Sequence, residues 1–373
     1  MDIKTFKVER WMNDYEDEAV YNLGETCIDS ITVGELLDMA GEDADKYLIG
    51  LKDKRLTYGY IFGSPDLLSG ISSMYESITP EQVIPTHGAI GANHQVIMSM
   101  IRPTDNMVSV MPTYQQHYSI PESIGAEVRI HQLTLENNFL PDLDLLRSQV
   151  DENTRMITVN NPDNPTGSWI PKDTMMEIVK IAEEVGAFIL SDEVYRGISE
   201  DGSYMHSIVD LYDKGISVGS MSKIFSMAGL RIGWIATRSE EVLKACHTRR
   251  DYDTISCGTL DDMFASLALK HRDKIFDRNR QILLKNRAIL DKWVNETEGV
   301  RYLKPVAGTT ALVYYDKDIP SYDLAIRLIK EKGVLVTPGA AFEIEGALRI
   351  GYAFDSKTLE DGLSKITELL KEN

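Results

Sequence analysis

One stretch of this sequence decides the fold to expect: Ser220-Met221-Ser222-Lys223-Ile224-Phe225-Ser226-Met227-Ala228-Gly229-Leu230-Arg231-Ile232-Gly233-Trp234. Lys223 stands at the end of a short apolar run, next to the small residue Ser222. A lysine is usually a solvated surface charge, so this position needs further signals before it indicates a function. Arg231 supplies one, because it lies between two glycines and its guanidinium group suits a pair of phosphate oxygens.

Two shorter pieces lie upstream of this stretch: Asn164-Pro165-Thr166-Gly167 and Ser191-Asp192-Glu193-Val194-Tyr195. Taken alone, the first piece is a good turn sequence. Asp192 would by itself suit the N-cap of a helix. The occurrence of all three pieces in this order favours a common site over three unrelated features.

Together, the three pieces resemble the cofactor site of fold-type I pyridoxal-phosphate (PLP) enzymes of the class I/II, aspartate-aminotransferase-like, family. The resemblance implies an α/β fold with a three-layer large domain, built on a mostly parallel seven-stranded sheet, and a smaller α+β domain. We expect residues 46–285 to form the large domain, and residues 1–45 and 286–373 the small one. The implied activity is an aminotransferase that moves an amino group between an L-amino acid and a 2-oxo acid through a Schiff base on Lys223.

The resemblance also assigns roles around the cofactor ring. PLP withdraws electrons well only while its ring nitrogen is protonated, and a buried carboxylate stabilises that proton. Asp192 matches this carboxylate, while Tyr195 and Asn164 match the side chains that bind the ring oxygen. Lys223, Asp192 and Tyr195 are therefore the expected catalytic residues.

Further positions match the family's binding residues. The implied phosphate ligands are Arg231, Ser220, Ser222 and the turn Gly88-Ala89-Ile90, which reads as the start of a helix. Tyr114 matches an aromatic side chain that stacks on the ring, and His117 lies near it. Tyr58 resembles a tyrosine that reaches the phosphate from a neighbouring subunit, which implies a homodimer with shared active sites. Arg349 and Gly24 are the expected substrate-binding residues.

Composition limits the other classes of function. The formal net charge is −19, which disfavours nucleic acids and anionic membranes as partners. Three cysteines without a CxxC pair favour a reducing compartment, and we expect a cytoplasmic protein. The histidines show no metal-ligand spacing, so no metal is predicted.

Short β-branched runs alternate with helical patterns through the middle of the chain, as in a mostly parallel sheet. One helix is expected over 172–185 and a long one over about 261–294, with a closing helix over 359–370. The predicted strands are 107–111, 127–132, 156–160, 188–191, 216–219, 232–237, 311–315, 334–337 and 347–352.

The sequence departs from the family at its N-terminal end. Common members carry Gly-Glu-Pro-Asp-Phe at the substrate rim, whereas this chain has Leu23-Gly24-Glu25-Thr26-Cys27-Ile28-Asp29-Ser30. The sequence therefore does not identify the substrate. It also allows another PLP reaction, such as β-elimination or a capreomycidine-synthase-like cyclisation of an arginine derivative. A non-catalytic binding relative is also open. Ser220 to Lys223 further satisfies S-x-x-K, the nucleophile motif of penicillin-binding serine hydrolases, but the partner motif Lys-Thr-Gly is absent.

Overall fold

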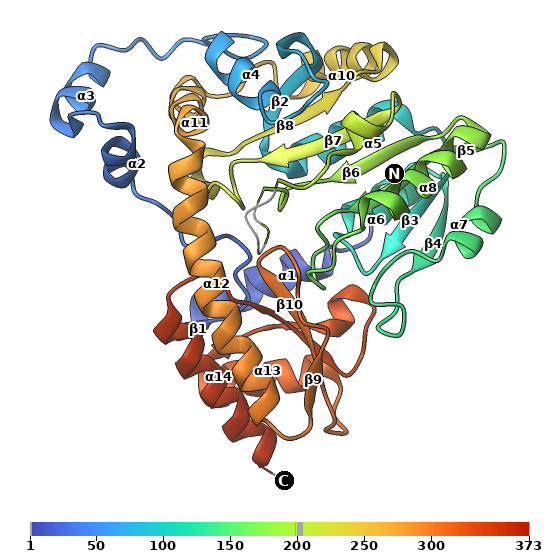
Figure 1. Ribbon diagram of the computed structural model, residues 1–373, viewed down its shortest axis with the longest axis vertical. Coiled ribbons are helices and arrows are strands. Elements are labelled where there is room, and N and C mark those ends of the chain that lie inside the picture. Colours follow the sequence, from blue (N-terminus) through green and yellow to red (C-terminus); the bar gives the residue numbers. More distant parts are fainter. Residues whose placement is uncertain (1, 198, 200–203, 373) are drawn as a thin grey trace.

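Seven strands form the central sheet of the computed structural model, which describes residues 2–197, 199 and 204–372 (Figure 1). Their spatial order is β2-β8-β7-β6-β5-β3-β4, and every strand except β8 runs in the same direction. Parallel strands that are covered on both faces are apolar throughout, as the buried runs here are. The strands are β2 (Val83–His87), β3 (Asn106–Met111), β4 (Glu127–Gln132), β5 (Thr154–Asn160), β6 (Phe188–Asp192), β7 (Gly215–Ser220) and β8 (Ile232–Thr237).

Helices cover both faces of this sheet and make three layers. Consecutive strand residues point to opposite faces, so Val83 joins one hydrophobic cluster and Ile84 the other. The smaller cluster holds α5 and α10 against the sheet, and the larger cluster holds α4, α8 and α11. The helices of this part are α4 (Pro65–Ser72), α5 (Gly88–Met100), α6 (Gln116–Ser123), α7 (Leu143–Gln149), α8 (Lys172–Val185), α9 (Ile208–Leu211), α10 (Glu240–Asp253) and α11 (Thr259–Lys270).

A second, antiparallel sheet has the strand order β12-β13-β10-β9; α13 packs against β12 and β13, and α12 against β9. The N-terminal segment joins this part of the chain, because β1 pairs in parallel with β11 and α1 contacts β12. The long helix α12 (Arg272–Glu296) runs from the central sheet to α14 (Figure 1). The remaining elements are α1 (Lys7–Tyr15), β1 (Tyr21–Asn22), α2 (Val33–Ala40), α3 (Ala44–Leu51), β9 (Val300–Tyr302), β10 (Thr310–Tyr315), α13 (Ser321–Lys332), β11 (Val334–Leu335), β12 (Thr337–Pro338), β13 (Ala347–Gly351) and α14 (Ser356–Lys371).

The α/β fold with a mostly parallel seven-stranded sheet is confirmed, but two predicted elements were wrong. The helix expected over 261–294 is two helices, because α11 packs on α4 whereas α12 turns at His271 toward α14. The strand expected over 334–337 is also two, because β11 pairs with β1 while β12 pairs with β13. The division into domains at residues 45/46 and 285/286 stays a prediction.

Of the helices in the described part of the chain, none combines the length and apolarity that a bilayer span requires.

Gly233 offers a test of how tightly β8 packs on the turn before α5. A Cβ atom at this position would overlap the backbone of Gly88 and Ala89, which cannot move without displacing the start of α5. We therefore expect Gly233→Ala to lower the free energy of unfolding by about 1–3 kcal/mol. Gly229→Ala is the matched control, because no heavy atom lies within 4 Å of its Cβ position. Urea titration followed by circular dichroism measures both, and equal losses would contradict the packing argument.

Candidate active site

A cavity of about 490 Å³ opens at the carboxyl ends of β5, β6 and β7. Ligands of α/β sheets bind at this edge, in the loops that follow the strands. Helix α1 closes the cavity on the side away from the sheet through Val8, Glu9 and Met12. The cavity gathers all but two of the predicted site residues: Gly24, Ala89, Ile90, Tyr114, Asn164, Asp192, Tyr195, Ser220, Ser222, Lys223, Arg231 and Arg349.

A larger cavity of about 920 Å³ lies among α3, α4 and α11, and none of the predicted residues lines it. The smaller cavity is therefore the candidate active site.

Lys223 follows β7 and projects its amine into the cavity. Its Nζ donates to Thr26 Oγ1 at 2.6 Å and to Cys27 Sγ at 3.4 Å. Burial alone would lower the pKa of Lys223, but the acidic groups of Cys27, Tyr195 and Glu25 outweigh it and raise the pKa. The Lys223 amine is thus a half-buried cation that its neighbours stabilise.

Asp192 is the last residue of β6 and is 4% exposed. Its carboxylate accepts hydrogen bonds from Asn93 Nδ2 at 2.7 Å and from the Val194 N–H at 3.2 Å. Burial raises the pKa of Asp192 to about 6 against these two donors. His117 Nε2 lies 3.9 Å from the carboxylate, and burial lowers the pKa of His117 to about 4, so the imidazole is neutral.

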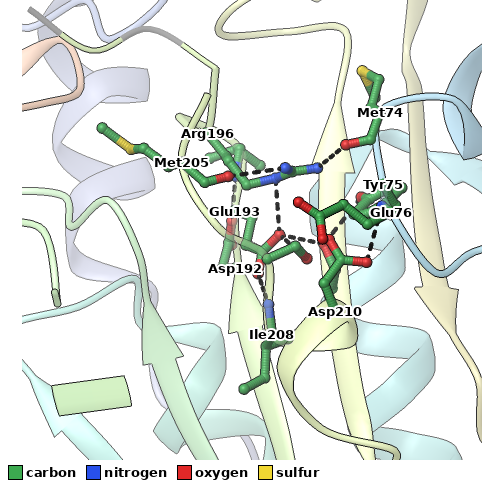
Figure 2. Close-up of polar contacts among 12 residues, drawn as sticks. Met74, Tyr75, Glu76, Asp192, Glu193, Arg196, Met205, Ile208 and Asp210 are labelled. Carbon is green, nitrogen blue, oxygen red and sulfur yellow. Dashed lines mark hydrogen bonds and ion pairs between the residues drawn. The ribbon is translucent and has the colours of Figure 1, made fainter. Parts of the chain in front are cut away.

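A buried ion pair fixes the turn that carries Asp192 and Tyr195 (Figure 2). Arg196 Nε lies 3.2 Å from Glu193 Oε2, and both residues are 4% exposed. The guanidinium group also donates to the carbonyl oxygens of Met74 and Met205, at 2.8 and 3.1 Å. Since breaking such a pair leaves an uncompensated buried charge, the turn is held in one position.

On the other wall, Arg349 of β13 meets Asn164. Arg349 donates to Asn164 Oδ1 at 3.3 Å, to the Gly24 carbonyl at 2.7 Å and to Thr337 Oγ1 at 2.8 Å. Burial lowers the pKa of Arg349 and raises that of Tyr195. The side chains at positions 164, 195 and 349 thus share one wall of the cavity.

The opposite end of the cavity lies at the start of α5. Ala89 and Ile90 belong to its first turn, where backbone N–H groups have no partner within the helix. Gly88 does not line the cavity, but its N–H donates to the Arg231 carbonyl at 2.9 Å. The Arg231 guanidinium donates to Ser222 Oγ at 3.5 Å, and Ser220 Oγ accepts from the Ser222 N–H at 2.9 Å. The residues predicted for phosphate are therefore neighbours.

Of the two tyrosines predicted to bind the cofactor from outside the main motifs, one lines the cavity and the other does not. Tyr114 lines the cavity and donates its hydroxyl to Glu9. Tyr58 is 66% exposed and lies outside the cavity. In this single chain it contributes nothing to the site.

Sequence analysis missed several residues of the cavity wall. Asn93 binds the Asp192 carboxylate from the α5 helix, and Thr26 and Cys27 bind the Lys223 amine. Glu9 and Glu16 reach the cavity from the N-terminal segment. The only available signal was the unusual sequence 23–30, since isolated polar residues far from a motif carry none.

The residues present fit PLP. Three buried polar atoms of the cavity wall have no hydrogen-bond partner of ordinary geometry in the described part of the chain: Tyr195 Oη, Asn93 Oδ1 and Arg349 Nε. Buried polar atoms are normally hydrogen-bonded, so these atoms indicate that the cavity binds a polar ligand. Asp192 suits a protonated ring nitrogen, and the start of α5 with Arg231 suits a phosphate group.

Comparison with known proteins gives the same result. The model of the family described as aminotransferase class I and II matches residues 26–366. The chain belongs to this family. Capreomycidine synthase of Streptomyces vinaceus is 28% identical over 97% of this chain and 93% of its own length. An aspartate aminotransferase of Sulfurisphaera tokodaii is 25% identical over the same shares. A PLP-dependent aminotransferase of Streptococcus suis has a crystal structure that matches with a TM-score of 0.96 and 43% identity, over 100% of both chains.

The chain is thus a PLP-dependent enzyme of the aminotransferase class. The serine hydrolase alternative finds no support, because the Lys223 amine bonds Thr26 and Cys27 while Ser220 Oγ bonds backbone groups.

Asp192 allows a test by pH. In the cofactor-free protein its folded pKa of about 6 lies above the ordinary value of 3.8, so ionisation costs stability as the pH rises from about 4 to 6. We expect Asp192→Asn to gain up to about 3 kcal/mol relative to wild type between pH 4 and pH 7. Urea titrations at several pH values measure this difference.

Adding the cofactor supplies the control for this prediction. A cationic ring nitrogen stabilises the wild-type carboxylate, so saturation with PLP should make wild type the more stable of the two at pH 7. A difference that does not change with pH in the cofactor-free proteins would contradict the prediction.

Proposed function

We propose that this chain transfers an amino group between an L-amino acid and a 2-oxo acid, with Lys223 as the residue that binds PLP covalently. One observation supports this above all: the half-buried Lys223, the buried Asp192 carboxylate and the buried Arg349 guanidinium line one cavity. We also propose the domain division at residues 45/46 and 285/286, with the cavity formed by both parts.

PLP, when bound, supplies a reactive aldehyde carbon and a ring that withdraws electrons from the substrate's α-carbon. Asp192 holds a proton on the ring nitrogen, because an opposite charge favours the cationic form. Tyr195 and Asn164 bind and orient the ring oxygen. Lys223, in its neutral form, would act as the general base that moves the proton at the substrate's α-carbon.

Arg349 binds the substrate α-carboxylate through its positive charge and its unpartnered Nε–H. Gly24 helps from its backbone, because its carbonyl already fixes one Nη of Arg349. Ser220, Ser222, Arg231 and the amides of residues 88–90 bind the phosphate group, and Tyr114 stacks on the ring.

We further propose a homodimer in which Tyr58 completes the partner's site. The support is a set of exposed apolar side chains on the segment that carries Tyr58 and on residues 252–260, which water would not favour in a free monomer. They are Leu48, Ile49, Leu56, Tyr60, Ile61, Phe62, Tyr252, Ile255 and Leu260. A cytoplasmic location also stays a proposal, supported by three cysteines that are all free.

A second candidate is a lyase or cyclase that uses the same cofactor residues. Its support is the similarity to capreomycidine synthase together with the unusual segment 23–30, which contacts the Lys223 amine. Formation of a 2-oxo acid with transfer to an acceptor distinguishes the aminotransferase from a reaction that releases ammonia or retains it in a ring.

Lys223→Ala tests the covalent role of the lysine. The purified wild type should show the visible absorption of lysine-bound PLP, and the variant should lose both this band and about a thousandfold or more of the activity. Lys292→Ala, at an exposed position of α12, is the control and should keep both. A wild type that takes up no PLP on reconstitution would refute the proposal.

Mixing two inactive variants tests the shared site. In a dimer of Lys223→Ala with Tyr58→Ala, one of the two sites has an intact Lys223 and an intact Tyr58 from the other subunit. Equal mixing with random exchange should therefore restore up to about a quarter of the wild-type activity. The mixture is refolded together and assayed, with separately refolded variants as the control. No recovery despite dimers on a sizing column would mean that Tyr58 does not act across the interface.

A further inference from the structure

The cavity carries more negative charge than the cofactor requires. Besides Asp192, which is assigned to the ring nitrogen, it is lined by the carboxylates of Glu9, Glu16 and Glu25. Within the described part of the chain, these three accept hydrogen bonds from neutral groups and form no ion pair with a lysine or arginine within 4 Å. Glu25 also stabilises the charged Lys223 amine, whereas Glu9 and Glu16 have no role assigned at the cofactor.

Two of the three carboxylates come from the N-terminal helix and the turn after it. Residues 8, 12 and 16 are four positions apart, so they share the side of α1 that faces the cavity, and Glu9 lies next to this stripe. Tyr114 fixes Glu9 by donating its hydroxyl. Glu16 instead keeps an exposed side chain at the cavity rim.

Glu25 lies deeper, and its position is fixed by the backbone. Its Oε1 accepts from the N–H groups of Thr26 and Cys27, both at 2.7 Å. Burial alone would raise the pKa of Glu25, but Lys223 and these two donors lower it, so Glu25 is charged.

A chain of hydrogen bonds through Asn22 and Gly24 connects Glu16 to Arg349 and fixes the distance between them. Asn22 Nδ2 donates to Glu16 at 3.3 Å, while its Oδ1 accepts from the Gly24 N–H at 3.0 Å. Gly24 in turn accepts from Arg349. Arg349 Nε is buried, lines the same cavity and lacks a partner in the described part of the chain, which indicates a polar ligand at this wall in addition to the cofactor.

The carboxylates also repel one another. Burial and then the charge of Glu25 raise the pKa of Glu16 above its usual range. A cation that enters between them removes this repulsion, whereas an anion increases it.

We propose that the amino-acid substrate carries a cationic side chain, an ammonium or a guanidinium group, which Glu9, Glu16 and Glu25 bind while Arg349 binds the α-carboxylate. This inference rests on the proposed function, because it assumes that the substrate occupies this cavity. The same carboxylates disfavour L-aspartate, L-glutamate and 2-oxoglutarate, whose second carboxylate would face them.

The test compares donors of three charges on the PLP-loaded enzyme. L-Arginine, L-ornithine and L-lysine are cationic, L-citrulline and L-norleucine are neutral counterparts, and L-glutamate and L-aspartate are anionic. Pyruvate serves as the acceptor. Both kcat/KM and the dissociation constant, obtained from the cofactor's absorbance and from the shift in Tm, are measured. For at least one cationic donor, kcat/KM should be roughly tenfold or more above that of its neutral counterpart, and the dissociation constant should be lower.

Variants at the rim assign this preference to the carboxylates. Glu16→Gln should lower by about tenfold the ratio of kcat/KM for the best cationic donor to kcat/KM for L-norleucine. Glu16→Lys should lower it further and favour L-glutamate relative to wild type. Asp17→Asn is the matched control, because Asp17 is an exposed carboxylate in the same turn that does not line the cavity. Its ratio should stay that of wild type.

The outcomes separate this inference from the proposed function. If neutral or anionic donors react and bind best, the inference is overturned while the aminotransferase stands. If no donor transfers its amino group but cationic amino acids still bind most tightly, the proposed function fails and the inference holds. A cationic preference that survives both Glu16 variants, and also the double variant with Glu9→Gln, would likewise overturn it.

Discussion

The placement of two opposite charges in one cavity, Asp192 buried and Lys223 half-buried, is the constraint on which the rest of the structure depends. Moving an ion out of water costs several kcal/mol unless its surroundings compensate. Asp192 is compensated by Asn93 and a backbone N–H, and Lys223 by hydrogen bonds to the 26–27 segment. The adjacent parallel strands β6 and β7 bring these residues to the same edge of the sheet.

A loop of unusual backbone conformation carries Lys223, and other segments hold it in place. Ser226 and Arg231 adopt left-handed φ angles of 60° and 49°, a conformation that costs of order 1 kcal/mol each outside glycine. From α12, Asn279 donates to the Ile224 carbonyl at 2.8 Å, and Arg278 donates to the Asp29 carbonyl at 2.9 Å. Helix α12 therefore fixes both the lysine loop and the N-terminal segment that meets it.

The sequence predicted what is local and missed what depends on distant packing. Asp192 and Ser220 end their strands and Tyr114 follows one, so all three are visible in short motifs, and the structure brings them to one cavity. Asn93 is one polar residue on a helix, and its bond to Asp192 depends on how α5 crosses the sheet, which no spacing reveals. The break at His271 was missed because the helical pattern continues on both sides of it.

The hydrogen bonds of Arg349 preorganise the substrate pocket before substrate binds. Its two Nη groups are already held by Asn164, Gly24 and Thr337, so the guanidinium plane is fixed without a ligand. Ordering a free arginine side chain on binding would cost about 0.5–1.5 kcal/mol, which this arrangement avoids. Gly24 belongs to the N-terminal segment and Asn164 follows β5. The orientation of Arg349 therefore depends on the position of both segments. A shift of the N-terminal segment would thus change carboxylate binding and the charge around Lys223 together, which couples substrate choice to the state of the catalytic amine.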